Sequence, residues 1–274
     1  MPTPAAPANA GSPPLAYHDL EFLDSEEGRP VRILSEYLQP LHELMLQGVR
    51  DTIVVFGSAR LAEDGVLKEY YAAARELCRR LTEWSNGLDS SSRFLVCTGG
   101  GGGIMEAANR GAHDAGGRTI GLNIGLPHEQ RPNRYITPGL CFQFHYFFMR
   151  KLWFAHLARA MVVFPGGFGT MDELFEILTL SQTGKLDRTI PVLMYGSKYW
   201  KRVIDFDAFV EHGMIAASDL ELMRFVDDPL EAFELLREAL APKAAPEPHA
   251  PAIARSSTPT RPANPRASQP KGDR

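Results

Sequence analysis

The segment Pro165-Gly166-Gly167-Phe168-Gly169-Thr170, which leads to Glu173, decides how this chain is interpreted. It follows the apolar run at residues 160–164 and precedes a helical pattern over residues 171–182. A glycine turn between a buried strand and a helix lets backbone N–H groups approach an anion, and the helix N-terminus adds partial positive charge. We therefore expect a phosphate site here, with Gly166, Gly167, Gly169 and Thr170 as its ligands.

The same strand–turn–helix unit recurs along the chain. A predicted strand at 53–56 ends in Gly57-Ser58, and another at 94–97 is followed by five glycines, Gly99 to Gly103, and a helix at 104–115. Strands alternating with helices predict a parallel sheet covered on both faces. The fold class is therefore α/β, a Rossmann-like doubly wound parallel sheet in a single domain over 15–241. Further strands are expected at 119–122, 160–164, 191–195 and 225–226, and further helices at 31–49, 67–84, 144–157, 199–211 and 229–240. Pro40 is expected to kink or split the first of these helices.

Ligands of such sheets bind outside the carboxyl ends of the strands, so the three glycine turns predict one crevice. We expect the earlier turns to contribute phosphate or ribose contacts, although a flexible turn without a ligand is the alternative; the residues are Gly57, Ser58, Gly100, Gly101, Gly102 and Gly103. A dinucleotide motif would need glycine where Ile104 stands and an acidic residue about 20 positions further on. Neither is present, nor is a P-loop, so NAD is disfavoured.

Glu173 and Arg150 each admit two interpretations. Thr170-x-x-Glu173 has the spacing of a capping box, in which both side chains would only cap a helix. Arg150 and Lys151 lie among aromatic residues, where such a pair snorkels to the surface or places Arg150 in the crevice opposite Glu173. His145 could act as an acid or base, but a surface or structural histidine fits better.

Composition limits the remaining classes of function. The chain of 274 residues has five of its 21 prolines in residues 1–14 and eight in residues 242–274, so both ends are expected to be disordered tails. The body is more acidic than the overall net charge of −4, because the second tail is basic; we expect no nucleic-acid partner. Three isolated cysteines show no zinc or disulfide pattern, and no apolar run could span a bilayer. A cytoplasmic protein without a metal, a cofactor or a membrane partner is expected.

Three motifs in order carry a family resemblance: Gly99-Gly-Gly-Gly-Gly-Ile-Met-Glu-Ala-Ala-Asn-Arg-Gly-Ala112, Met149-Arg150-Lys151, and Pro165-Gly-Gly-Phe-Gly-Thr-Met-Asp-Glu173. Over residues 51–226 the chain resembles the Lonely Guy (LOG) family of cytokinin riboside 5′-monophosphate phosphoribohydrolases, often mislabelled lysine decarboxylases, and looks like its longer bacterial subgroup. The resemblance implies that Arg150 and Glu173 are catalytic, that Lys151 belongs to the site, and that the protein forms homodimers or higher oligomers. Phe148 stands where the short-type family has histidine.

The resemblance implies hydrolysis of the N-glycosidic bond of a purine nucleoside 5′-monophosphate to free base and ribose 5-phosphate. Glu173 would stabilise the oxocarbenium-like sugar or activate water. Arg150 would hold the ribose or the carboxylate in place, and its charge would keep Glu173 ionised at neutral pH. Two alternatives stay open. One is an AMP nucleosidase of purine salvage, and the other is a molybdenum-cofactor carrier that binds its ligand without hydrolysis.

Overall fold

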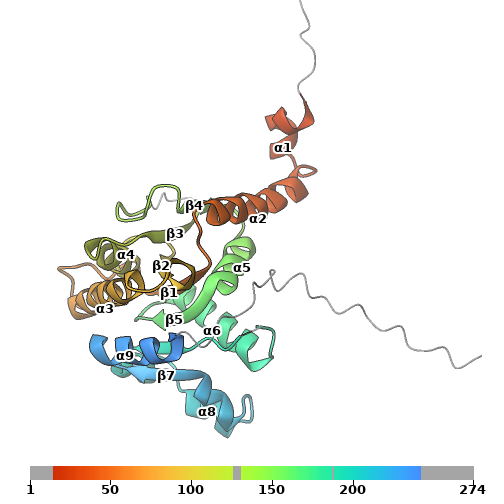
Figure 1. Ribbon diagram of the computed structural model, residues 1–274. Helices are drawn as coiled ribbons and strands as arrows, with labels where there is room; N and C mark the ends of the chain where they lie inside the picture. Colours follow the sequence, from red (N-terminus) through yellow and green to blue (C-terminus); the bar gives the residue numbers. More distant parts are fainter. Residues whose placement is uncertain (1–14, 126–130, 187, 242–274) are drawn as a thin grey trace, which may run out of the picture.

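The computed structural model describes residues 15–125, 131–186 and 188–241 (Figure 1). The tails predicted at residues 1–14 and 242–274 lie outside these ranges. No helix within the described ranges is long and apolar enough to cross a membrane.

All seven strands of the described sheet are parallel, in the order β4-β3-β2-β1-β5-β6-β7. The strands are β1 (Asp51–Phe56), β2 (Phe94–Thr98), β3 (Thr119–Ile124), β4 (Cys141–Phe144), β5 (Ala158–Val163), β6 (Val192–Tyr195) and β7 (Met223–Val226). The chain first adds strands on one side of β1 and then crosses to place β5 on its other side. The order therefore reverses between β1 and β5, the position at which doubly wound sheets bind ligands. The predicted fold class is confirmed.

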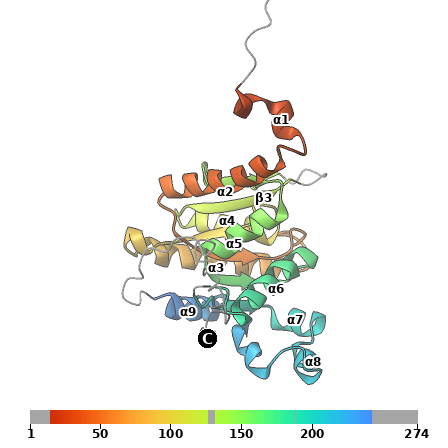
Figure 2. The ribbon, with the colours of Figure 1, turned by 90° about the vertical axis from the view of Figure 1, so that its right-hand side faces the viewer.

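Helices cover both faces of the sheet (Figures 1 and 2). One face is covered by α3 (Lys68–Asn86), α4 (Ile104–Asp114) and α9 (Pro229–Leu240), and the other by α2 (Arg29–Leu46), α5 (Phe147–Leu157) and α6 (Phe168–Gln182). Successive residues of β1 alternate between the two layers, since side chains of a strand point to opposite faces. Ile53 and Val55 join the core beneath α3, α4 and α9, whereas Val54 and Phe56 join the other core.

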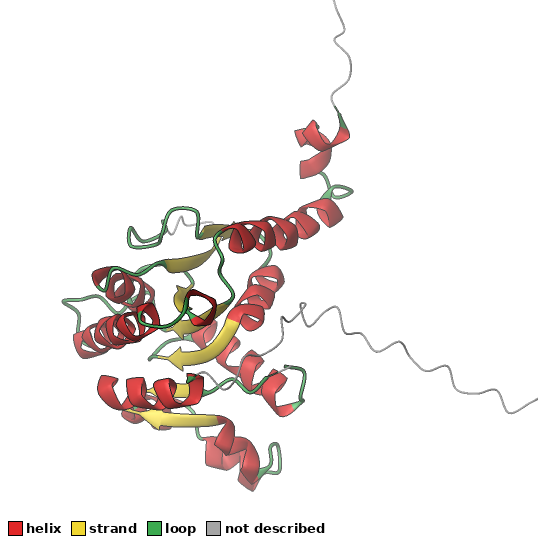
Figure 3. Ribbon diagram, in the orientation of Figure 1, coloured by secondary structure: helices red, strands yellow, loops and turns green. Residues whose placement is uncertain are grey.

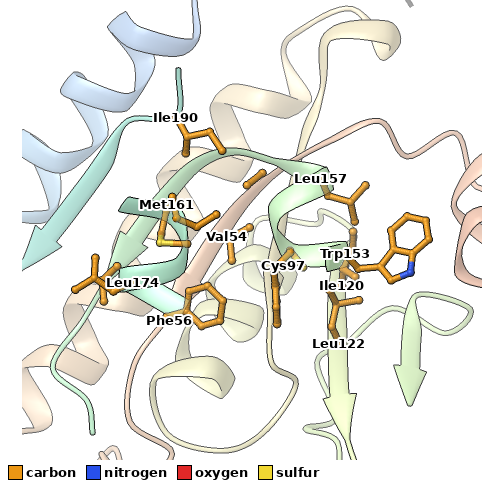
Figure 4. Close-up of a cluster of buried hydrophobic side chains, with 14 of the residues drawn as sticks. Val54, Phe56, Cys97, Ile120, Leu122, Trp153, Leu157, Met161, Leu174 and Ile190 are labelled. Atoms are coloured by element: carbon orange, nitrogen blue, oxygen red, sulfur yellow. The ribbon is translucent and has the colours of Figure 1, made fainter. Parts of the chain in front are cut away.

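The second core fixes the two helices that carry the predicted catalytic residues. Figure 4 shows Trp153 of α5 and Leu174 of α6 in one cluster with Val54, Phe56 and Met161 of the central strands. Trp153 is 1% exposed and Leu174 is 0% exposed. These anchors lie three residues after Arg150 and one residue after Glu173, so packing holds both helices in register with the sheet.

Three sequence predictions about elements are wrong. β4 was not expected, and a helix was predicted from residue 144, yet Cys141–Phe144 is an edge strand whose burial alternates residue by residue. The helix predicted at 199–211 is two helices, α7 (Ser197–Val203) and α8 (Phe206–Glu211), because the Asp205 side chain accepts the Ala208 N–H and starts the second. Of the two outcomes expected at Pro40, the split is wrong, because α2 continues through this residue; the kink stays a prediction. The remaining short elements are η1 (Ala16–His18), α1 (Leu20–Asp24), η2 (Ser90–Ser92) and η3 (Ala217–Leu222). Figure 3 distinguishes the helices, in red, from the strands of the sheet, in yellow.

Candidate functional site

A cavity of about 730 Å³ lies at the carboxyl ends of β1 and β5. Its walls are residues 56–61 after β1, residues 165–173 at the start of α6, and Arg150 of α5, together with Leu67, Gly99, Met105, Ile124, Phe147 and Tyr199. The predicted crevice is therefore present at the reversal point of the sheet. The cavity is lined by the predicted catalytic residues Arg150 and Glu173. Of the predicted phosphate or ribose ligands, those that line it are Gly57, Ser58, Gly166, Gly167, Gly169 and Thr170.

The turn before α6 presents free backbone donors to this cavity. α6 begins at Phe168 with Gly167 as its N-cap, and no side chain caps it. Within the described residues, the N–H groups of Gly167, Phe168, Gly169 and Thr170 have no hydrogen-bond acceptor. Four such donors at a helix N-terminus can hold an anion, and their binding of a phosphate stays a prediction.

The capping-box interpretation of Thr170 and Glu173 is wrong. A capping box needs Thr170 at the N-cap, but the helix starts three residues earlier than predicted, so Thr170 lies in its first turn and Glu173 in its second. Thr170 is instead packed against the turn, where a Cβ on Gly166 would lie 2.1 Å from Thr170 Oγ1. Both side chains are free of a capping role.

The turns after β1, β2 and β5 are tied to one another by backbone hydrogen bonds. The Ser58 N–H donates to Pro165 O at 3.0 Å, and the Ile104 N–H donates to Ser58 O at 3.1 Å. A Cβ on Gly57 would lie 2.6 Å from the Ile104 side chain, so only glycine lets β1 pass this close to α4. The three glycine turns thus form one rigid floor.

Of the five consecutive glycines, only Gly99 lines the cavity; Gly100, Gly101, Gly102 and Gly103 are outside its lining. The Asn133 side chain donates to Gly100 O at 3.1 Å and to Gly101 O at 3.0 Å, and Asn133 Nδ2 also lies 2.9 Å from Asn109 Oδ1. Gly103 has φ 61° and is the N-cap of α4. These glycines shape the loop, and their predicted contact with a phosphate stays a prediction.

Replacing Gly103 with Ala is expected to destabilise the fold by about 2–4 kcal/mol, because the left-handed backbone and the packing penalties add. An added Cβ would lie 2.4 Å from Ser58 O in the floor of the cavity. Gly169→Ala is the control, since its added Cβ meets nothing within 4 Å and it lies inside a helix. Urea unfolding should separate the two variants; equal midpoints would contradict the packing role.

Glu173 is a buried carboxylate, with 5% of its surface exposed. Burial raises its pKa to about 7, and the Arg150 charge opposes this shift without cancelling it. The expected effect of Arg150, to favour the ionised form of Glu173, has the right direction, but desolvation is the larger effect, so Glu173 is only partly ionised at neutral pH. Near pH 7 the side chain exchanges a proton readily, which suits an acid–base role.

The raised pKa of Glu173 predicts the pH dependence of any reaction that needs its carboxylate. As the pH increases through about 7, the carboxylate fraction increases, so kcat/KM should rise with pH and level off above this value. A pH–rate profile measures it. A profile that is already flat from pH 5 upward would show that the reaction does not need the deprotonation of Glu173.

Arg150 lies inside the cavity rather than reaching the surface. A Cβ on Gly99 would lie 3.1 Å from Arg150 Nη2, so the absent side chain of Gly99 makes room for the guanidinium. Its Cζ lies 5.3 Å from the centre of the Phe154 ring. Its Nε is buried and finds no hydrogen-bond partner among the residues that the structure describes, and burial lowers the pKa of Arg150 while Glu173 raises it. No ion pair within 4.0 Å satisfies Arg150 among the described residues, so its donors are available to a ligand.

Lys151 does not line the cavity, so its place among the phosphate or ribose ligands stays a prediction. Its Nζ lies 2.9 Å from Asp172 Oδ1 and 3.2 Å from Glu176 Oε2. The two carboxylates flank Glu173 on α6, and Lys151 follows Arg150 on α5. The ion pairs therefore join α5 and α6 next to Arg150 and Glu173, the two charged residues that line the cavity.

Sequence patterns did not identify Tyr199 as part of the site, or Glu36 as a support for the helix that carries Arg150. Tyr199 lines the cavity, and its hydroxyl donates to Gly166 O at 2.7 Å. The Glu36 carboxylate of α2 accepts the N–H groups of His145 at 2.6 Å and Tyr146 at 3.2 Å, at the start of α5. His145 itself is exposed and does not line the cavity, in keeping with the interpretation favoured from sequence.

The chain is similar to known proteins along much of its length. Residues 105–236 match the family model described as possible lysine decarboxylase. A protein of Oryza sativa subsp. japonica, named a probable cytokinin riboside 5′-monophosphate phosphoribohydrolase, is 32% identical over 195 residues, covering 70% of this chain and 79% of that protein. The chain belongs to the Lonely Guy family. An Arabidopsis thaliana member named cytokinin riboside 5′-monophosphate phosphoribohydrolase is 29% identical over 155 residues, covering 56% of this chain and 71% of that protein.

Among solved structures, an X-ray structure from a structural-genomics consortium matches with a TM-score of 0.50 and 21% identity, covering 69% of this chain and 99% of that one. It supports the fold alone. The Lonely Guy relatives named above are phosphoribohydrolases, which implies a nucleoside monophosphate as the class of substrate at the level of the family.

Proposed function

We propose that this Lonely Guy protein hydrolyses the N-glycosidic bond of a purine nucleoside 5′-monophosphate, releasing free base and ribose 5-phosphate. The observation that carries the proposal is the buried Glu173 carboxyl with a pKa of about 7, in a cavity that also holds Arg150 and the free N–H groups of α6. The names of the relatives support the same reaction.

The 5′-phosphate binds at the start of α6. Its oxygens accept the N–H groups of residues 167–170, and the positive end of the 15-residue helix stabilises the charge. The phosphate is remote from C1′, so its binding energy orients the sugar for reaction rather than changing the reacting bond itself. A nucleoside without the phosphate should therefore be a poor substrate.

The sugar lies between the phosphate site and Glu173. As the bond from C1′ to the base nitrogen breaks, positive charge develops on the ribose, and the Glu173 carboxylate stabilises it. The oxygen of a water molecule then bonds to C1′ and the Glu173 carboxylate takes a proton from that water. The departing base gains a proton from solvent, and Glu173 returns its proton to solvent, which restores the carboxylate. Arg150 donates hydrogen bonds to the ribose hydroxyls, or holds the carboxylate, from the opposite wall.

The base lies against the apolar part of the wall. Leu61, Leu67, Met105, Ile124 and Phe147 line the cavity, and none of them offers a polar side chain for recognition. Burying an apolar substituent of the base against this surface stabilises the complex by about 25 cal/mol per Å² of apolar area removed from water. We therefore place an N6-prenylated adenine ahead of adenine as the preferred base, with AMP as the alternative substrate.

Incubating the purified protein with AMP and with N6-isopentenyl-AMP tests the proposal. The expected products are free base and ribose 5-phosphate in equal amounts, with the larger kcat/KM for the prenylated nucleotide. Release from neither nucleotide would contradict hydrolysis, and a larger value for AMP would favour a salvage nucleosidase.

We also propose that α2 and the N-terminal arm pair with a second copy of the chain. Val31, Leu34, Leu38 and Met45 are exposed on α2 at the spacing of a coiled-coil seam. The arm formed by η1 and α1 projects from the body and exposes Leu15, Tyr17 and Leu20 (Figure 1). Light scattering should give an oligomer that Leu38→Glu dissociates and that Leu230→Glu, at an exposed leucine of α9, leaves intact.

A further inference from the structure

The carbonyl groups of the segment that leads into α6 are held by partners from two other parts of the chain. Trp200 Nε1 donates to Val163 O at 3.1 Å, and the Ser58 N–H donates to Pro165 O at 3.0 Å. The third donor is the Tyr199 hydroxyl, which lies 2.7 Å from Gly166 O. Tyr199 and Trp200 are neighbours on α7, so one short helix fixes both ends of the turn.

The hydrogen bond from Tyr199 determines the orientation of the peptide between Gly166 and Gly167. No peptide bond of the described residues is cis, and in a planar trans peptide the C=O and the following N–H point in opposite directions. Because Tyr199 holds the Gly166 carbonyl, the Gly167 N–H is directed away from the hydroxyl. That N–H has no acceptor among the described residues, and Gly167 lines the cavity.

Without this hydrogen bond the peptide would have little to hold it. A flip changes only ψ of Gly166 and φ of Gly167, and glycine adopts almost every backbone conformation at low cost. A Cβ on Gly167 would meet nothing within 4 Å, so packing does not restrain that residue. The flipped peptide would present a carbonyl oxygen, which repels an anion, where the N–H now stands.

We propose that Tyr199 is a positioning residue for phosphate recognition: its hydroxyl holds the Gly166–Gly167 peptide so that the Gly167 N–H faces the phosphate of the ligand. The inference rests on the proposed function for the identity of that ligand. Tyr199 acts through the backbone and touches neither C1′ nor the leaving base.

Tyr195 supplies a matched control. Its hydroxyl donates to Asp227 O at 2.9 Å, so Tyr195→Phe removes a bond of the same kind, but Tyr195 does not line the cavity. Any loss that comes only from removing a hydrogen-bonded phenol hydroxyl should appear in both variants. A loss specific to the phosphate should appear only in Tyr199→Phe.

Calorimetric titration of the full-length protein and both variants with AMP and with adenosine tests this role. We expect Tyr199→Phe to weaken AMP binding roughly three- to tenfold, the range of one net hydrogen bond, with adenosine binding unchanged. Tyr195→Phe should bind both ligands as the parent protein does. Parental affinity of Tyr199→Phe for AMP, or an equal loss for AMP and adenosine, would overturn the inference.

The same titrations separate this inference from the proposed reaction. If the parent protein binds AMP, Tyr199→Phe weakens that binding selectively and neither AMP nor its prenylated form is cleaved, then the hydrolase proposal is wrong and the role of Tyr199 stands. If the parent protein cleaves the nucleotide while Tyr199→Phe keeps full AMP affinity, the reaction stands and the role of Tyr199 is wrong. A parent protein that binds no AMP contradicts both.

Discussion

Replacing Glu173 with Gln is expected to lower kcat/KM for a nucleoside 5′-monophosphate by about 10²–10⁴-fold, the usual contribution of a positioned acid or base. Gln keeps the size of the side chain but can neither take a proton from water nor place a negative charge beside the developing oxocarbenium ion. Steady-state assays at about pH 8, where the parental carboxylate is largely ionised, give the comparison its greatest range.

Glu173→Gln should keep the stability of the parent protein even though it loses activity. The pKa of Glu173 is about 7 in the folded protein and near the ordinary 4.5 when unfolded, so between these values the folded state holds more protons. The contribution of Glu173 to stability is therefore fully present below about 4.5 and is lost as the pH rises through about 7. Gln removes the buried charge, and Glu173→Gln should melt no lower than the parent at about pH 8.

If Glu173 were only a helix cap, Glu173→Gln would lose stability and keep its activity. Losing a helix cap costs about 0.5–2 kcal/mol, which would appear as a lower melting temperature together with substantial residual activity. Asp228→Ala is the control for such a loss, because the Asp228 side chain accepts the N–H groups of Leu230 and Glu231 at the start of α9. Full activity in Glu173→Gln would show that the carboxylate is not part of the reaction.

The fold could be predicted because its strands are buried on both faces. Runs such as residues 53–56 and 160–164 are apolar at every position, and that pattern with intervening helices is typical of a parallel sheet. β4 lacks this signal: its burial alternates, and it lies at the edge of the sheet. The alternation of Phe142 and Phe144 with Cys141 and Gln143 was the sequence signal that could have identified it.

The site could be predicted only in part, because sequence order does not show where a helix starts or what lies opposite it. The turn before α6 was recognisable from its glycines, but Thr170 and Glu173 were open to a capping role until the helix start was known. Tyr199 comes from a helix 26 residues after Glu173 in the chain, and only the pairing of β5 with β6 brings it to Gly166. No local pattern marks such a contact.

Arg150→Met is expected to be the second most damaging substitution, lowering kcat/KM at neutral pH by about 10²–10³-fold, comparable with the loss of a preorganised donor at a reacting centre. Met fills a similar volume but carries no charge. Arg150 opposes the effect of burial on Glu173, so its removal should move the pKa of Glu173 above 7 and shift the rising part of the pH–rate profile to higher pH. Arg150→Lys, which keeps the charge but not the planar fork, should move the profile less.

The pH dependence of that loss distinguishes two ways in which Arg150 could act. If Arg150 served only to keep Glu173 ionised, raising the pH would restore the activity of Arg150→Met completely. A guanidinium that also binds the substrate leaves a deficit at every pH, and the buried Nε without a partner favours this second outcome. The double variant Arg150→Met, Glu173→Gln should then lose much less than the product of the single losses, since two groups that act on one reacting centre are not additive. Additive losses would mean that Arg150 and Glu173 act independently, although both line the same cavity.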